Sequence, residues 1–511
     1  MSVNKQVPPS DRPVLAGGRL GTAGVLFFAL AAATPLTVVA AIIPAAYAGG
    51  LLLVPLGFLA LGLILLVFSA GYTAMIRRAP TAGPLYSVVV RGLGRPLGVG
   101  AAWVALLSYN ALQIGLYGAV GAAAEPVLTS RFGGTVPWWQ IALGCWAVVA
   151  LLGLVRVEVA GWLLAVLVLA ETAVIVGFSA ADLLDPAGGR IPVSPPDLSH
   201  LDRPALGLLL IGAALAFVGF ETAAAYGEEA RRPRRAIGRA TYLAVLALAL
   251  LYAGAAWALS VGTGSANVAA LSAGRGPELL FDLAAARLAP WAVTLGRVLL
   301  LTGTVAAMIA LHHTIARYLL ALGRDRVLPG WLGRTARSTR APRAASLTQT
   351  VLAGVVIGGY AVFSPHKPLP GWLGVAGGVG VLLLLAAVSL AALLFLNRAP
   401  DGENAWRRFL APGLATIAFG TLGYLAFVNL AELLGVRPGD PLTRILPGAF
   451  GLAVLFGIGY GLVLRKTRPI VYAGIGLGGT AVVVSPTSAP VPKQRTPGAH
   501  RPERINRELT Q

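Results

Sequence analysis

Apolar stretches of about 20 residues recur along the chain, separated by short segments that contain charged residues, prolines or glycines. A helix needs about 20 apolar residues to cross the roughly 30 Å hydrocarbon core of a bilayer. The pattern predicts twelve such helices, near 24–47, 51–75, 97–123, 137–155, 159–179, 205–226, 240–261, 290–316, 345–363, 370–396, 411–431 and 445–464. Only the short hinge at 156–158 separates the fourth from the fifth. The chain is therefore predicted to be an all-α integral membrane protein with about twelve transmembrane helices.

Composition supports a membrane environment. Of the 511 residues, 57% are hydrophobic and 12% are charged, whereas soluble domains carry about 25% charged residues. So few charged side chains would not cover a hydrophobic core of this size with a wetted surface. Lipid is therefore expected to contact most of the protein surface.

The net charge of +20 raises the question of a nucleic-acid partner, but its distribution points elsewhere. If the N-terminal tail (1–20) is cytoplasmic, 31 of the 40 lysines and arginines fall in segments on the cytoplasmic side and 8 on the other side. This is the positive-inside pattern of membrane proteins. We expect a multi-pass protein of the inner or plasma membrane with both termini cytoplasmic, a disordered basic tail at 466–511, and no nucleic-acid partner.

The sequence offers little for catalysis or metal binding. Its lone cysteine, Cys145, excludes a disulfide framework. No Gly-x-Ser-x-Gly elbow, phosphate-binding loop or cluster with metal-ligand spacing occurs. We therefore predict a transporter rather than an enzyme, with no catalytic residues, no metal and no cofactor; a channel or receptor is the other class considered.

Ionisable residues inside the predicted spans are few. They are Glu171, Glu221, Arg297, His312 and His313. An ionisable side chain within the bilayer costs several kcal/mol, so each is a candidate functional residue. Arg297 is within reach of the outer interface, and the histidines either relay protons or lie at the interface near the end of their helix.

Two spans contain residues that interrupt a helix. Pro35 follows Ala33 and Thr34 in span one, and Gly219 precedes Glu221 in span six. Proline removes a backbone donor, and unwound backbone at membrane depth survives where it lines a cavity. Glycine and proline are also common in ordinary membrane helices, but two breaks five spans apart, one beside an acid, favour a solute site.

Three motifs resemble those of the amino acid–polyamine–organocation permeases. They are the segments from Phe217 to Pro233, at 79–86 (Ala-Pro-Thr-Ala-Gly-Pro-Leu-Tyr) and at 316–329, and the similarity covers about 20–465. The resemblance implies two inverted five-helix repeats (21–180 and 200–396) with broken helices 1 and 6, plus two extra helices (410–465). It also implies alternating access, and import or exchange of amino acids or related amines.

The resemblance further implies where the substrate binds. In such permeases its carboxylate and amino group meet the unwound backbone, which here comprises Ala33, Thr34, Pro35, Phe217, Val218 and Gly219. The acid of the span-six motif falls on Glu221, with a role in coupling and gating. Residues 32–36 read Ala-Ala-Thr-Pro-Leu instead of the common Gly-Ser/Thr-Gly turn, and Leu215 stands in the place of an aromatic gate.

Glu171 falls near the place where some proton-coupled relatives carry a lysine. A carboxylate can carry a proton or bind sodium; a proton is the expected coupling ion and sodium is the alternative. In span three, Tyr109, Gln113 and Tyr117 share one helix face, with Asn110 beside them. Asn110 and Gln113 either read the substrate side chain or pack between helices.

Glu228 and Glu229 form either an ion-pair latch at the inner end or an ordinary wetted helix end. The expected partners are a small amino acid or amine, the coupling ion and membrane lipid, and the protein is expected to be a monomer or loose homodimer. Sequence does not identify the substrate.

Overall fold

The computed structural model describes residues 15, 17–78, 84–132, 135–191, 203–336, 339–400 and 402–477. Most of the predicted N-terminal tail, residues 79–83 of the second motif and the tail beyond 477 lie outside these residues.

Helices make up almost all of the described structure. Span one consists of α1 (Thr22–Ala32), α2 (Pro35–Thr37), the π-helical η2 (Val38–Ile42) and α3 (Ile43–Ala48). Spans two to five are α4 (Val54–Arg78), α6 (Arg95–Phe132), α7 (Trp138–Leu152) and α8 (Val157–Leu184). Span six combines α9 (Arg203–Ala216) with the 3-10 helix η3 (Phe220–Tyr226).

The second half continues with α10 (Pro233–Thr263), α13 (Pro290–Arg324), α14 (Arg343–Phe363) and α15 (Trp372–Arg398). Spans eleven and twelve are η6 (Trp406–Leu410) with α16 (Ala411–Val428), and α18 (Leu442–Thr467). The connections contain α5 (Tyr86–Leu93), α11 (Val268–Arg275), η4 (Gly276–Glu278), α12 (Leu279–Arg287), η5 (Gly330–Gly333), α17 (Leu430–Leu434) and α19 (Pro469–Gly474).

The predicted membrane-protein fold class is confirmed. Among the described residues, eleven helices are long and apolar enough to cross a membrane, and α7, with 15 residues, is shorter. Several helices extend beyond the predicted spans: α6 continues to Phe132, α10 begins at Pro233, and α13 continues to Arg324. His312 and His313 therefore do not lie at the end of their helix.

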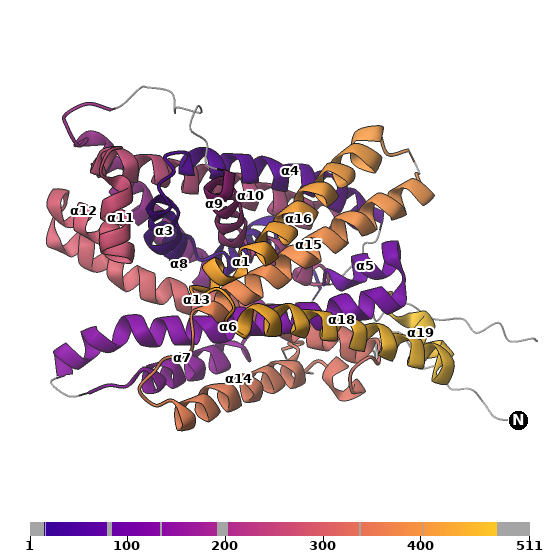
Figure 1. Cartoon of the computed structure of the whole chain (residues 1–511). Helices are drawn as coiled ribbons and strands as arrows, with labels where there is room; N and C mark the ends of the chain where they lie inside the picture. The colour runs from indigo at the N-terminus through magenta and orange to yellow at the C-terminus, as the bar shows by residue number, and fades with distance from the viewer. Residues whose placement is uncertain are drawn as a thin grey trace, which may run out of the picture.

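The loops gather at two ends of the bundle, as twelve crossings require (Figure 1). At the end that holds α5 and α19, Arg398 donates to the Gly92 carbonyl and Arg19 pairs with Glu158. At the opposite end, α11 packs on α3, and the Ala187 amide donates to the Val261 carbonyl. Short α7 therefore counts as a crossing.

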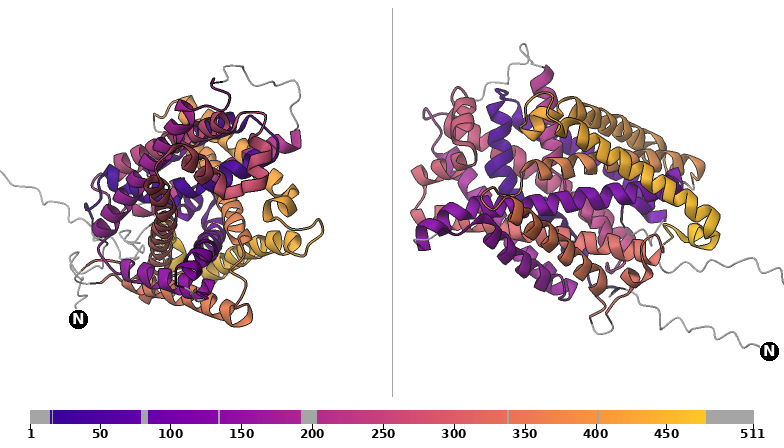
Figure 2. Two further views of the ribbon diagram at one scale, coloured as in Figure 1. Left: turned by 90° about the vertical axis from the view of Figure 1, so that its left-hand side faces the viewer. Right: turned by 60° about the horizontal axis from the view of Figure 1, so that its bottom comes forward.

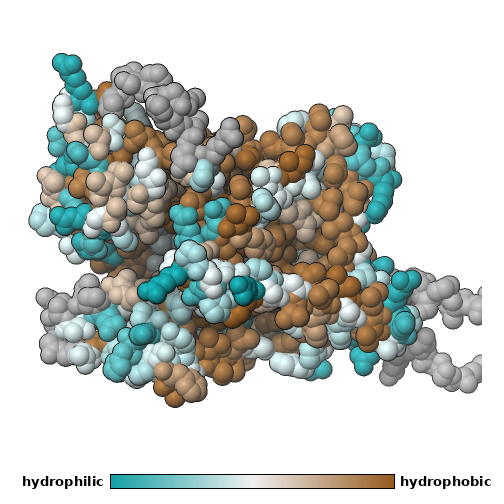
Figure 3. All heavy atoms as spheres, in the orientation of Figure 1, coloured by the Kyte–Doolittle hydropathy of each residue, from teal (hydrophilic) through white to brown (hydrophobic). Residues whose placement is uncertain are grey.

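The outer surface of the bundle is apolar. Brown side chains cover α15, α16 and α18 on the face shown in Figure 3, and teal ones gather at its right-hand end. In α16 and α18, Ile417, Leu452 and Leu455 are exposed. Large apolar side chains exposed along whole helices are suited to contact with lipid.

The start of the C-terminal tail departs from the prediction. Residues 469–474 form α19, and the chain then folds back so that Ile475 is buried. The Gly476 amide and the Tyr86 hydroxyl both donate to Asp325 Oδ2, at 2.8 Å each. Burial raises the pKa of Asp325 to about 6, although both hydrogen bonds oppose the shift. Disorder is therefore the wrong description for 469–477, where tertiary contacts order the chain.

Candidate functional site

Span one is broken where the sequence indicated. Helix α1 ends at Ala32, Thr34 has a left-handed backbone with φ +48°, and Pro35 begins α2. Proline has no amide hydrogen and disfavours helical geometry in the residue before it. A non-glycine residue in this conformation stores about 1–3 kcal/mol of strain, which is often found at functional sites.

Span six is broken at Phe217–Gly219, between α9 and η3. Gly219 has φ +122°, which residues with a side chain rarely adopt. A Cβ there would lie 2.5 Å from backbone atoms of Ala32 and Ala33. The two breaks therefore touch through their backbones, and Figure 2 shows the helices that surround them from two further sides.

Glu221 binds the span-six break itself. The carboxylate is fully buried and accepts hydrogen bonds from the Gly219 amide at 2.8 Å and from the Tyr109 hydroxyl at 3.0 Å. The Thr222 hydroxyl donates to the Gly219 carbonyl at 2.6 Å. Across the junction, the Tyr252 hydroxyl donates to the Ala33 carbonyl at 3.2 Å. Side chains of η3 and α10 thus hold backbone groups freed by the breaks, and Tyr109 of α6 holds Glu221 in place.

Glu171 lies at the other side of the junction. Its Oε2 accepts the Leu36 amide of α2 at 3.3 Å. Gly303 of α13 lies so close to the carboxylate that a Cβ there would overlap it. The Thr37 and Thr304 hydroxyls, from α2 and α13, are 3.5 Å apart. Each of these hydroxyls belongs to the chain neighbour of a residue that lies against the Glu171 carboxylate.

Phe217 and Val218 are buried at the break, and the Phe217 ring packs edge-on against Tyr252 with centroids 5.5 Å apart. The predicted pair on α6, in contrast, faces elsewhere. The Gln349 amide on α14 donates to Asn110 Oδ1 and Gln113 Oε1, at 2.8 Å each, and Gln113 donates to the Met308 carbonyl at 3.2 Å. These hydrogen bonds join α6, α13 and α14, as the packing alternative describes, whereas Tyr109 reaches the break.

The two glutamates at the end of span six are both paired. Arg317 donates to both carboxylate oxygens of Glu229, at 2.7 and 2.8 Å, and lies 4.3 Å from the centre of the Tyr226 ring. The Arg317 and Glu229 side chains are 2% and 3% exposed. Glu228 pairs with Arg324 at 2.6 Å in a more open position. A wetted helix end therefore does not describe Glu229.

We call the Arg317–Glu229 pair the inner latch, after the role that is proposed for it below. The amides of Arg19 and Leu20 both donate to the Glu229 carbonyl at 2.9 Å, which places the start of span one over the latch. The cleft beside the pair has a volume of about 10 Å³, about enough for one water molecule. Beside the pair there is thus no room for a solute larger than water.

The histidines of α13 are buried, which corrects the expectation of an interfacial position. His312 Nε2 lies 2.8 Å from Ser346 Oγ, and the His313 ring packs against Phe28. Arg297 lies near the end of the bundle that holds α11 and α12, where it pairs with Glu278 and covers the Phe281 ring. A structural role accounts for all these contacts.

Another arginine joins several segments at this end of the bundle, which the sequence did not indicate. Arg287 of α12 lies 3.5 Å from Asp182 Oδ1 and 3.3 Å from Asp185 Oδ2, and it also donates to the Gly262 carbonyl. It therefore ties the ends of α8 and α10 to the α11–α12 hairpin, which packs on α3 and η2. A loop arginine carries no sequence signal of this, because its partners are up to 105 residues away.

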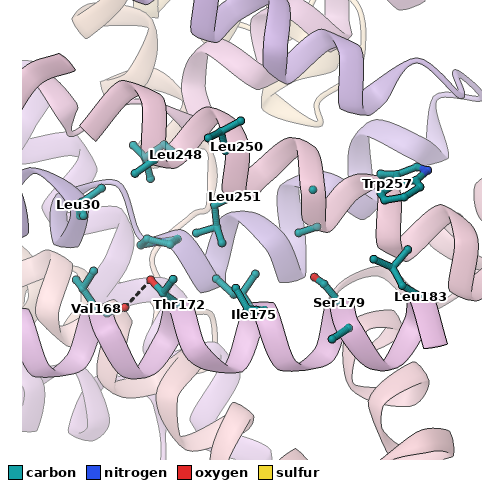
Figure 4. A pocket seen from close by; sticks show the side chains of 16 residues that line it. Leu30, Val168, Thr172, Ile175, Ser179, Leu183, Leu248, Leu250, Leu251 and Trp257 are labelled. Atoms are coloured by element: carbon teal, nitrogen blue, oxygen red, sulfur yellow. Dashed lines mark hydrogen bonds between the residues drawn. The ribbon is translucent and has the colours of Figure 1, made fainter. Parts of the chain in front are cut away.

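A groove of about 500 Å³ lies between α8 and α10 (Figure 4). Its lining is almost entirely aliphatic, and Thr172, one of its few polar residues, donates to the Val168 carbonyl. Exposed Val176 and Leu250 place it on the lipid-facing side. This groove therefore does not suit a small polar solute.

The described residues contain no group of three or more potential metal ligands. Comparison with known proteins finds a match to the model of a family described as amino acid permease over residues 20–442. Proteins named as uncharacterized transporters in Mycobacterium bovis and in two strains of Mycobacterium tuberculosis are each 27% identical over 400 residues. The aligned part covers 76% of this chain and 83% of each relative. The family match includes both broken spans.

Proposed function

We propose, from the premise that this chain belongs to the amino acid permease family, that it is a secondary active transporter of a small amine or amino acid. Family membership and the transporter-named relatives make it a membrane transporter. The finer proposal is that alternating access exposes the junction of the two breaks first to one side of the membrane and then to the other.

The observation that carries the proposal is the backbone contact between the breaks, with a buried carboxylate bonded to each. Glu221 holds the Gly219 amide and Glu171 holds the Leu36 amide. Burying an acid within a membrane costs free energy, so such a residue is a candidate for a functional role. Binding a cationic group or a coupling ion is such a role. Both acids also contact backbone that must rearrange when the site opens.

In this proposal the substrate contacts the unwound backbone from Ala33 to Pro35 and from Phe217 to Gly219. Glu221 senses occupancy through the Gly219 amide, while Glu171 binds the coupling proton or sodium beside the Thr37 and Thr304 hydroxyls. The inner latch and the Glu228–Arg324 pair close the cytoplasmic end. The spans up to α15 form the two inverted repeats, and both termini are cytoplasmic.

Uptake into proteoliposomes with imposed proton or sodium gradients tests this function. We expect saturable uptake driven by one of the two gradients. Glu221→Gln should greatly reduce uptake in a folded protein, and Glu171→Gln should change the ion dependence. Unaltered uptake with identical ion dependence in both variants would remove these assignments, and flux that does not saturate would indicate a channel.

A further inference from the structure

At the junction of the breaks, the backbone donors are bonded within the protein, whereas some backbone acceptors are not. This difference indicates the chemistry of the substrate. From Phe217 to Phe220, every backbone amide has an acceptor within the protein. In span one, the amides of Ala33 and Thr34 bond to the preceding turn, and Pro35 has no amide hydrogen. The next amide, Leu36, is bonded to Glu171. These stretches offer a substrate carboxylate no free backbone donor.

At the same junction, some backbone carbonyl groups have no hydrogen-bond donor. Within the residues that the structure describes, no donor reaches the carbonyl of Ala32 or of Val218. Glu171 and Glu221 add two carboxylates, and no lysine, arginine or histidine pairs with either acid in the described part of the chain. The junction therefore presents oxygen acceptors, and each acid adds a negative charge when it is ionised.

A carboxylate entering this junction would meet like charge where these acids are ionised, and the backbone amides at 33–36 and 217–220 would give its oxygens no donor. Both effects disfavour binding strongly. An ammonium group has three donors and a positive charge, so it matches the carbonyls and the acids. The protein's own glutamates occupy the amides that would otherwise hold a substrate carboxylate.

We infer that the substrate is an amine with no carboxylate beside its amino group, and that Glu171 and Glu221 determine this specificity. The inference rests on the transport function proposed above and narrows it to one chemical class. Diamines and amino alcohols belong to this class, whereas the α-amino acids from which they differ by a carboxylate do not.

The test uses matched pairs that differ only in the carboxylate: cadaverine and lysine, ethanolamine and serine, tyramine and tyrosine. The methyl ester of each amino acid keeps its bulk but removes the charge. Thermal shift of the purified full-length protein measures binding, and uptake of each compound into proteoliposomes measures transport. For any pair that binds, we expect the amine to bind at least about 100-fold more tightly than the amino acid, with the ester close to the amine.

Equal affinity of an amino acid and its amine would overturn the inference and leave the transport function intact. An ester that binds as poorly as its amino acid would also overturn it, since size rather than charge would then decide. If no amine, amino acid or ester shows saturable uptake, the proposed transport function itself fails.

Variants of Glu171 and Glu221 test whether these two acids determine the preference for amines. Glu221→Gln should lower the amine preference at least about tenfold, because the amide side chain no longer repels a carboxylate. Glu278→Gln is the matched control, since that acid is exposed and pairs with Arg297 at the outer end; its preference should equal that of the wild type. A preference that Glu171→Gln and Glu221→Gln both leave unchanged would contradict the assignment to these acids.

Discussion

Breaking the inner latch should have a large and specific effect. The Arg317 and Glu229 side chains are almost fully buried and are joined by two hydrogen bonds of 2.7 and 2.8 Å. Removing one partner of such a pair leaves an uncompensated buried charge, which costs about 3–5 kcal/mol. Glu229→Gln should therefore destabilise the closed inner end by about 3 kcal/mol, which corresponds to roughly a 100-fold change in a two-state equilibrium.

The assay is labelling of a buried cysteine beside the latch. In a Cys145→Ala background, Ala230→Cys places a thiol where the native side chain is 4% exposed, next to Leu20. A water-soluble maleimide should label it up to about 100-fold faster when Glu229 is replaced by Gln. Thermal melting of the same proteins in detergent reports whether the variant remains folded.

Two comparisons make the result decisive. Glu228→Gln breaks the neighbouring pair, whose side chains are 27% and 11% exposed, and should change stability by about 1 kcal/mol or less. Combining Glu229→Gln with Arg317→Met should restore much of the loss, because no buried charge remains. If Glu229→Gln and Glu228→Gln label at the same rate, or if the double variant loses the sum of both single effects, the reasoning about the latch is refuted.

Three further predictions concern other parts of the molecule. Gly219→Ala should abolish transport and destabilise the protein by about 1–3 kcal/mol, because of its φ of +122° and the contact with span one; uptake and melting should be near wild type in Gly254→Ala, where a Cβ meets open space. Gln349→Leu should cost about 1–3 kcal/mol in melting experiments, since it leaves the α6 amides unpaired; altered substrate selectivity would instead favour the binding role for those amides. The pKa of Asp325 is raised to about 6 by burial, so wild-type stability should fall by up to about 3 kcal/mol as pH rises from 4 to 7; Asp325→Asn should remove that slope, and an unchanged slope would contradict the raised pKa.

Helices and breaks were readable from the sequence because their causes are local. A run of about 20 apolar residues dictates a spanning helix wherever it lies. Pro35 and Gly219 mark breaks through the conformations that their own backbones permit or exclude. The same reasoning found Glu171 and Glu221, because an acid within an apolar run is conspicuous without any knowledge of its neighbours.

What each polar side chain bonds was decided only by the tertiary structure. Tyr109 and Gln113 share one face of α6, yet one reaches Glu221 and the other Gln349. Arg317, within α13, and Asp325, just after it, find their partners in distant segments. A hydrogen bond depends on the position of both atoms, and the second atom here lies tens to hundreds of residues away, so the chain must pack before the partner exists.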